Sequence, residues 1–172
     1  MRILVLVGPK GSGKTYIGQL IEEHVPGATF LSVEDIAIDF IKSDPCYSTE
    51  SFNSPPFRAQ FFDYIRECID QLNGDRIVVF ESTGAAPETK AFFQSLSHDI
   101  GPVHLVRIRS SASTCADRIK SRDNSKQVDV SREMISRLHA TTESLEWAWE
   151  LELVNENLSK DEIVQSIIQF LS

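Results

Sequence analysis

The sequence predicts an α/β fold, in which a parallel β-sheet is covered by helices on both faces. Two observations lead to this prediction. Short apolar runs alternate with stretches of helical period along the whole chain, and the first of these runs, ILVLV, is apolar at every position. Strands that alternate with helices form parallel sheets, and strands buried on both faces are continuously apolar. The length of 172 residues suits one domain, spanning residues 1–172.

Each element follows from its local pattern. The apolar runs ILVLV, ATFLS, RIVVF, VHLVRI and WELELV predict strands at 3–7, 28–32, 76–80, 103–108 and 149–154. The stretches between them predict helices at 14–24, 34–43, 57–73, 87–97, 111–121, 131–146 and 159–171. The last helix is the best marked, because Ser159 can cap it and Glu162 follows three residues later. Polar stretches at 43–56 and 121–131 are expected to be loops, and loops of this length tend to be functional or mobile.

The composition argues against several classes of protein. No apolar run approaches the roughly 20 residues that span a bilayer, so no membrane partner is expected. The formal charge of -8 argues against electrostatic binding of a long nucleic acid. Three cysteines without a C-x-x-C spacing and four scattered histidines indicate neither a disulfide framework nor a zinc site. We expect a cytoplasmic protein with free thiols.

The stretch GPKGSGKT, residues 8–15, follows the first predicted strand and precedes the first predicted helix. It fits the pattern G-x-x-x-x-G-K-[ST] of a P-loop at every fixed position. Glycines allow successive backbone N–H groups to surround phosphate oxygens, and the following helix adds its positive dipole end. Lys14 is then expected to reach the β- and γ-phosphates, and the Thr15 hydroxyl to coordinate Mg²⁺. The predicted nucleotide-binding residues are Gly8, Pro9, Lys10, Gly11, Ser12, Gly13, Lys14, Thr15 and Tyr16.

The remaining motifs separate the protein classes that share this loop. Guanine specificity usually comes from an N-K-x-D element, and the nearest counterpart, NSKQ at 124–127, does not fit, so a GTPase is disfavoured. Glu81, in ESTG at the end of the third strand, can hold Mg²⁺ through water. The alternative is that Glu81 is a solvated strand end.

Together these motifs resemble the small P-loop kinases, the group that contains shikimate kinase, gluconate kinase and the nucleoside monophosphate kinases. The resemblance covers most of the chain, and it is carried by GPKGSGKT, SVEDI, FR at 57 and 58, ESTG, RIKSRD and NLSKDEIVQSI. It implies a three-layer α/β/α P-loop NTPase fold with a five-stranded parallel sheet in the order 2-3-1-4-5. It also implies a helical acceptor-binding segment at about 34–73 and a mobile helical lid at about 118–131.

The resemblance implies roles on the acceptor side. A carboxylate just past the second strand orients or deprotonates the acceptor hydroxyl, and Asp35 is our first choice over Glu34. Alternatively, both carboxylates only charge the first turn of their helix. Arg58 stands where an arginine binds an anionic acceptor, or else it packs along its own helix. Thr83 and Gly84 are acceptor-site candidates that stand in place of a three-glycine run, so shikimate itself is not the expected acceptor.

On the nucleotide side, Arg118, Arg122 and Lys126 are spaced four residues apart and would share one helical stripe. In such kinases a mobile lid arginine neutralises charge on the transferring phosphoryl group, which makes Arg118 and Arg122 candidates. The alternative is a solvated helix face. Asn155, after the final strand, lies where the family's adenine pocket is expected.

We therefore predict a kinase that uses ATP and Mg²⁺ and transfers the γ-phosphoryl group to a small-molecule acceptor, either a metabolite hydroxyl or a nucleotide. Two alternatives stay open: a nucleoside or polynucleotide 5′-hydroxyl kinase, and a non-catalytic nucleotide-binding regulator. In a regulator, Asp35→Asn would leave function intact while Lys14→Ala abolished nucleotide binding. Neither the acceptor nor the oligomeric state follows from the sequence.

Overall fold

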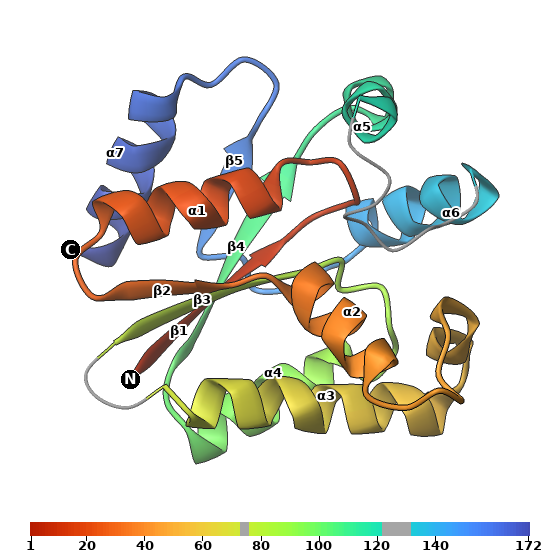
Figure 1. Ribbon diagram of the computed structural model, residues 1–172. Coiled ribbons are helices and arrows are strands. Elements are labelled where there is room, and N and C mark those ends of the chain that lie inside the picture. The colour runs from red at the N-terminus through yellow and green to blue at the C-terminus, as the bar shows by residue number, and fades with distance from the viewer. Residues whose placement is uncertain (73–75, 122–131) are drawn as a thin grey trace.

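The computed structural model describes residues 1–72, 76–121 and 132–172. In this part of the chain a five-stranded parallel sheet has the order β2-β3-β1-β4-β5, which confirms the predicted fold class (Figure 1). The strands are β1 (Arg2–Val7), β2 (Ala28–Leu31), β3 (Ile77–Ser82), β4 (Val103–Arg109) and β5 (Leu151–Val154). The helices are α1 (Lys14–His24), α2 (Val33–Lys42), η1 (Thr49–Asn53), α3 (Pro55–Asp70), α4 (Thr89–Asp99), α5 (Ala112–Lys120), α6 (Arg132–Glu143) and α7 (Lys160–Leu171).

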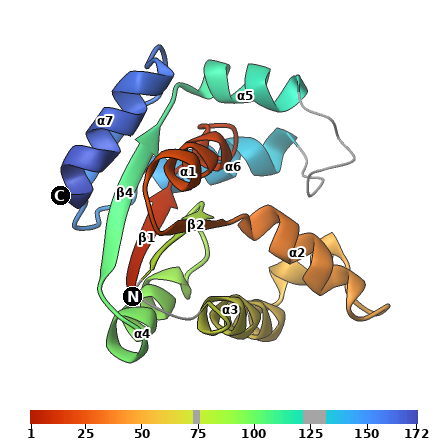
Figure 2. The same cartoon turned by 60° about the vertical axis from the view of Figure 1, so that its left-hand side comes forward.

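Helices cover both faces of the sheet (Figures 1 and 2). On one face α1 and α7 pack over β1, β3, β4 and β5, and Leu6, Ile17 and Ile167 belong to the buried cluster between these layers. On the other face α2, α3 and α4 enclose a second buried cluster that includes Phe61 and Phe93. Both faces of the sheet are therefore shielded from water, as the apolar strands require. Within the described ranges, no helix combines the length and the apolar character needed to cross a membrane.

The element boundaries depart from the predicted ones by a few residues. β3 continues to Ser82, because its ladder with β1 extends to the pair Val7 and Ser82. α3 begins at Pro55, where proline at the first helical position has no N–H to leave unpaired. The predicted loop at 43–56 contains the short helix η1. The second predicted loop is 121–131, and its residues 122–131, which include Lys126, lie outside the described residues.

The carboxyl ends of β1, β3 and β4 meet at one edge of the sheet. The register pairs Leu6 with Glu81 and Val7 with Arg107, and the Gly8 N–H donates to the Ser82 carbonyl at 3.1 Å. Ligands of open α/β sheets bind at this edge, at the point where the strand order reverses. The P-loop, the ESTG segment and the end of β4 are therefore placed together by the topology.

Candidate functional site

The P-loop, residues 8–15, connects β1 to α1 and takes its shape from glycines. Gly11 and Gly13 have φ values of 86° and 95°, in the left-handed region that disfavours other residues. A Cβ on Gly13 would lie 2.2 Å from the Asn155 amide nitrogen, and one on Gly11 would lie 2.5 Å from the Cys115 carbonyl oxygen. Both glycines are required for this conformation of the loop.

The P-loop is suited to an anionic ligand. Lys14 is only 7% exposed, and its ammonium group donates to the carbonyl oxygens of Gly8 and Pro9, both at 2.9 Å. The Ser12 hydroxyl is buried and makes no hydrogen bond within the described part of the chain. α1 begins immediately after Gly13, so its N-terminal N–H groups and positive dipole end lie at the loop. A buried ammonium at a helix N-terminus favours phosphate.

Thr15 and Glu81 lie together where the sequence predicts a metal site. The Thr15 hydroxyl donates to a Glu81 carboxylate oxygen at 2.9 Å, and Glu81 is buried at the end of β3. Mg²⁺ at phosphate-transfer sites uses one or two carboxylates together with water and phosphate oxygens, so this pair of oxygen donors fits it. The described residues hold no cluster of three or more His, Cys, Asp or Glu side chains that could bind a metal. Tyr16, the next residue, is half exposed.

The two candidate carboxylates at the start of α2 point in different directions. Glu34 forms an ion pair with Lys10 of the P-loop, with 3.0 Å between Oε1 and Nζ, and both side chains are largely buried. Asp35 is exposed, and its backbone N–H donates a hydrogen bond to the hydroxyl of the capping residue Ser32 at 3.2 Å. The structure therefore brings Glu34, and not Asp35, beside the P-loop.

Arg58 lies in the first turn of α3 and binds a carboxylate of this chain. Its Nε and Nη2 atoms donate to the two carboxylate oxygens of Glu88 at 3.0 and 2.8 Å, and Nη1 donates to the Phe52 carbonyl at 3.0 Å. These hydrogen bonds lower the pKa of Glu88 and raise the pKa of Arg58 from their ordinary values. Glu88 thus occupies the Nε and Nη2 side of the guanidinium and balances its charge.

Thr83 and Gly84 follow β3 and contact α6 and the chain after that helix. The Thr83 carbonyl accepts a hydrogen bond from the Thr142 hydroxyl at 2.8 Å. Gly84 packs so closely that a Cβ there would lie 2.6 Å from Leu145 and 3.0 Å from Trp147. Their contact with an acceptor stays a prediction.

Arg118 and Asn155 lie on the other side of the P-loop. Nη1 of Arg118 donates to the Ser110 hydroxyl at 3.1 Å and to the Ser12 carbonyl at 3.3 Å, and Nη2 donates to the Asn155 carbonyl at 2.9 Å. The Asn155 amide donates to the same Ser12 carbonyl at 2.8 Å. The chain after β4 and the chain after β5 therefore both contact the backbone of the P-loop. Arg122 lies outside the described residues.

Sequence reasoning missed two residues of this region, Glu88 and Ser110. Glu88 is the N-cap residue of α4, after the loop that follows β3, and Ser110 directly follows β4. Their position after the carboxyl ends of parallel strands is the signal that could have found both.

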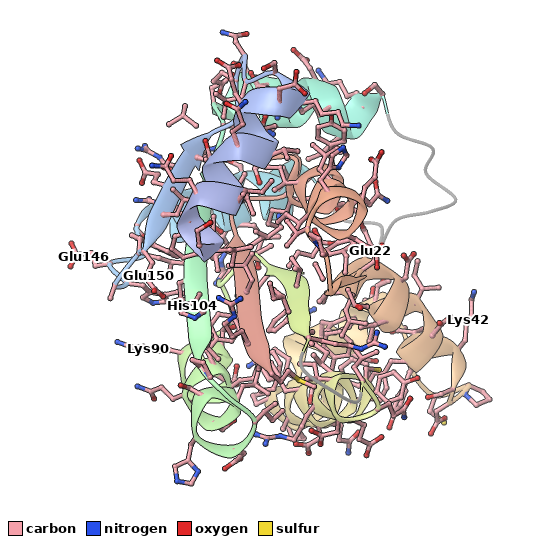
Figure 3. The ribbon with its side chains drawn as sticks, turned by 90° about the vertical axis from the view of Figure 1, so that its left-hand side faces the viewer. Glu22, Lys42, Lys90, His104, Glu146 and Glu150 are labelled. Atoms are coloured by element: carbon pink, nitrogen blue, oxygen red, sulfur yellow. The ribbon has the colours of Figure 1, made fainter. Side chains whose placement is uncertain are left out.

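His104 lies away from this edge and pairs with Glu150, with 2.9 Å between the ring nitrogen Nδ1 and a carboxylate oxygen (Figure 3).

Comparison with known protein families gives a match over most of the chain. The family described as an AAA domain matches residues 4–139, which include the P-loop, α2, α3, β3 and α5. The chain belongs to this family. A search of the curated proteins finds no match.

The solved structures that this chain resembles include several small kinases. The tunicamycin resistance protein of Deinococcus radiodurans has a TM-score of 0.69 at 14% identity, covering 99% of this chain and 95% of its own. Shikimate kinase from Acinetobacter baumannii, in complex with shikimate, has a TM-score of 0.67 at 17% identity, covering 98% and 92%. The APS kinase CysC of Mycobacterium tuberculosis, in complex with AMPPNP and APS, has a TM-score of 0.64 at 15% identity, covering 99% and 96%. The predicted resemblance to small P-loop kinases is confirmed in fold.

Proposed function

We propose that this protein is a kinase that transfers the γ-phosphoryl group of Mg-ATP to a hydroxyl group of a small molecule. The observation that carries the proposal is the ion pair between Lys10 and Glu34, at 3.0 Å, which places a carboxylate of the acceptor segment beside the phosphate-binding loop. A regulator that only binds nucleotide needs no carboxylate there. A phosphotransferase does, because one group has to accept the proton of the attacking hydroxyl.

The nucleotide is held by the P-loop. Its backbone N–H groups and the N-terminus of α1 bind the phosphate oxygens, and the Lys14 ammonium moves from the two loop carbonyls to the β- and γ-phosphates. Thr15 and Glu81 would hold Mg²⁺, which when bound neutralises charge on the β- and γ-phosphates. AMPPNP, an analogue of ATP, is named in the structure of the similar APS kinase, which supports ATP as the donor.

In the transfer step, the acceptor oxygen forms a bond to the γ-phosphorus while the bond from that phosphorus to the β,γ-bridging oxygen breaks, releasing ADP. The hydroxyl proton passes to the Glu34 carboxylate, which Lys10 orients. We assign this role to Glu34 rather than to Asp35, because the Asp35 side chain is exposed. Reactant positioning and charge neutralisation supply most of the catalysis in phosphoryl transfer, so a single proton acceptor is sufficient.

Arg118 and Asn155 are proposed to act at the nucleotide. Both already contact the backbone of Ser12 in the P-loop, so small movements of α5 carry Arg118 toward the phosphates. Asn155 is proposed to support the nucleotide site by holding the P-loop backbone, because its amide donates to the Ser12 carbonyl at 2.8 Å. Arg122 is proposed to close over the transferring group with the lid. The proposed setting is the cytoplasm, where ATP and small hydroxyl compounds are both present.

Nucleotide binding is tested by calorimetric titration with Mg-AMPPNP. Lys14→Met is expected to reduce affinity at least about 100-fold, because it removes a buried positive charge from the P-loop. Lys42→Met, the same change at an exposed helix end, is the control and should bind as the natural protein does. ATP consumption with a panel of hydroxyl compounds tests the kinase activity. Binding without turnover of any acceptor would favour the regulator instead.

A further inference from the structure

The predicted acceptor segment at about 34–73, which contains α2, η1 and α3, has little positive charge to offer a ligand. It contains eight acidic side chains and three basic ones, Lys42, Arg58 and Arg66. Lys42 is exposed at the last residue of α2, and Figure 3 shows it pointing away from the sheet. Arg66 donates to Asp99 at 2.7 Å and to Ser95 at 2.6 Å.

Of these three residues, only Arg58 lies at the phosphate-binding edge of the sheet. Its partner Glu88 is the N-cap of α4, and the chain reaches it directly from the carboxyl end of β3, where Glu81 contacts Thr15. α4 then runs to the opposite edge and ends at Asp99, the partner of Arg66. Of the two arginines in the acceptor segment, Arg58 is therefore the one that lies on the side where a phosphoryl acceptor would bind.

The Arg58 fork is filled by a carboxylate of the protein itself. Two parallel hydrogen bonds join it to Glu88, the geometry in which arginine binds carboxylate and phosphate ligands. The third donor binds the Phe52 carbonyl. The Arg58 side chain is 17% exposed and the Glu88 side chain 35% exposed, so water screens the pair less than it screens a fully exposed pair. An anionic acceptor would either displace Glu88 and leave that carboxylate unpaired, or share the guanidinium with it, so that two negative charges meet at one positive charge.

We propose that the acceptor is an uncharged or cationic hydroxyl compound, and that Glu88 is the specificity-determining residue that excludes acceptors carrying a carboxylate or a phosphate. This inference rests on the proposed kinase function. Glu88 acts on selection by occupying Arg58, and Glu34 balances the charge of Lys10, the P-loop lysine beside the segment. A polyol, a nucleoside or an amino sugar meets this requirement, whereas a sugar acid or a nucleoside monophosphate does not.

The first test measures whether Arg58 accepts an anion, and it does not depend on turnover. The Nε–Hε resonance of Arg58 in ¹⁵N-labelled protein, assigned by its loss in Arg58→Lys, is followed during titration with inorganic phosphate and with acetate. We expect no saturable shift in the natural protein and a saturable shift in Glu88→Gln, which keeps the shape of the side chain but removes its charge. A saturable shift in the natural protein, or none in Glu88→Gln, would overturn the proposal. Thermal unfolding verifies that Glu88→Gln is folded.

The second test compares matched acceptors in the ATP consumption assay: glucitol, glucosamine and gluconate, and adenosine with its monophosphate. In the natural protein the anionic member of each series should have a kcat/KM at least about 10-fold below the others. Glu88→Gln should move this ratio toward the anionic members by a similar factor. Asp99→Asn frees an arginine at the opposite edge and is the control that should leave the ratio unchanged. Preference for an anionic acceptor in the natural protein would overturn the proposal. If no acceptor supports ATP consumption, that result counts against the kinase function, and the titration then decides the role of Glu88.

Discussion

The contact between the P-loop and the β5–α7 connection gives the sharpest prediction about stability. Gly13 has a φ of 95°, and a Cβ there would lie 2.2 Å from the Asn155 amide nitrogen. Gly13→Ala therefore has two effects, which can be separated. The alanine is strained by the left-handed backbone, at roughly 1–2 kcal/mol. Its methyl group also pushes the Asn155 amide away from the Ser12 carbonyl, which it reaches at 2.8 Å in the structure.

The second effect has the size of one buried hydrogen bond, about 1 kcal/mol. Gly13→Ala should therefore lower the free energy of unfolding by about 2–3 kcal/mol. Asn155→Ala removes the same hydrogen bond and also removes the atom that collides with the new methyl group. The double variant should then be about as stable as Gly13→Ala alone, which corresponds to a coupling energy of about 1 kcal/mol.

Urea unfolding of the natural protein, the two single variants and the double variant measures this coupling. Gly27→Ala is the control, because Gly27 also has a positive φ, 77°, but lies in the turn between α1 and β2, away from Asn155. Asn155→Ala and Gly27→Ala should be additive. Strict additivity of Gly13→Ala with Asn155→Ala would refute the reasoning, as would an unchanged stability of Gly13→Ala.

Three further predictions concern other parts of the molecule. Glu34→Gln should lower kcat for ATP-dependent phosphorylation at least about 100-fold and Asp35→Asn by less than about 3-fold, measured by steady-state kinetics; equal losses would contradict the choice of Glu34. The pKa of Glu88 is lowered in the folded protein, so its ionised form stabilises the fold above the ordinary glutamate pKa, and this contribution is lost as the pH falls through the folded pKa. The free energy of unfolding of Glu88→Gln, measured in urea, should therefore decrease less at acid pH than that of the natural protein. The same decrease in both proteins would contradict this. Phe61→Ala, at a side chain that is 7% exposed, should lower the free energy of unfolding by about 3–5 kcal/mol while the folded protein keeps its Mg-AMPPNP affinity by titration, and a loss below about 1 kcal/mol would show that this ring is not core.

The parts of the site that the sequence predicts well are those governed by short spacing. GPKGSGKT supplies its own turn, its own N–H groups and its own helix start within eight residues, so its shape depends little on the rest of the fold. The same holds for α7, where Ser159 and Glu162 form the capping box that their spacing predicts. The position of Glu81 beside Thr15 also follows, because adjacent parallel strands end at the same edge.

The pairing of charges on the acceptor side could not be predicted in this way. Glu34 and Asp35 are adjacent in sequence, but consecutive helical residues point about 100° apart, so only one of them faces the P-loop. Which one does is decided by the angle at which α2 leaves β2, and this depends on how its apolar side packs on α3. The partner of Arg58 is 30 residues away and belongs to the connection after β3. No local pattern links the two.

This difference bears on why the motifs of the chain predict a nucleotide site but do not name the acceptor. The proposed phosphate site is made mainly of backbone groups, which persist when side chains change, and the fold is shared with proteins at 14–17% identity. The proposed acceptor side is made of side-chain pairs, and one substitution at Glu88 would change the charge that Arg58 presents while leaving the P-loop untouched. Under the proposed function, selectivity among acceptors can therefore diverge by single substitutions on an unchanged phosphate site. The residue that faces the arginine in the first turn of α3 is then the position at which relatives of this chain should differ when their acceptors differ in charge.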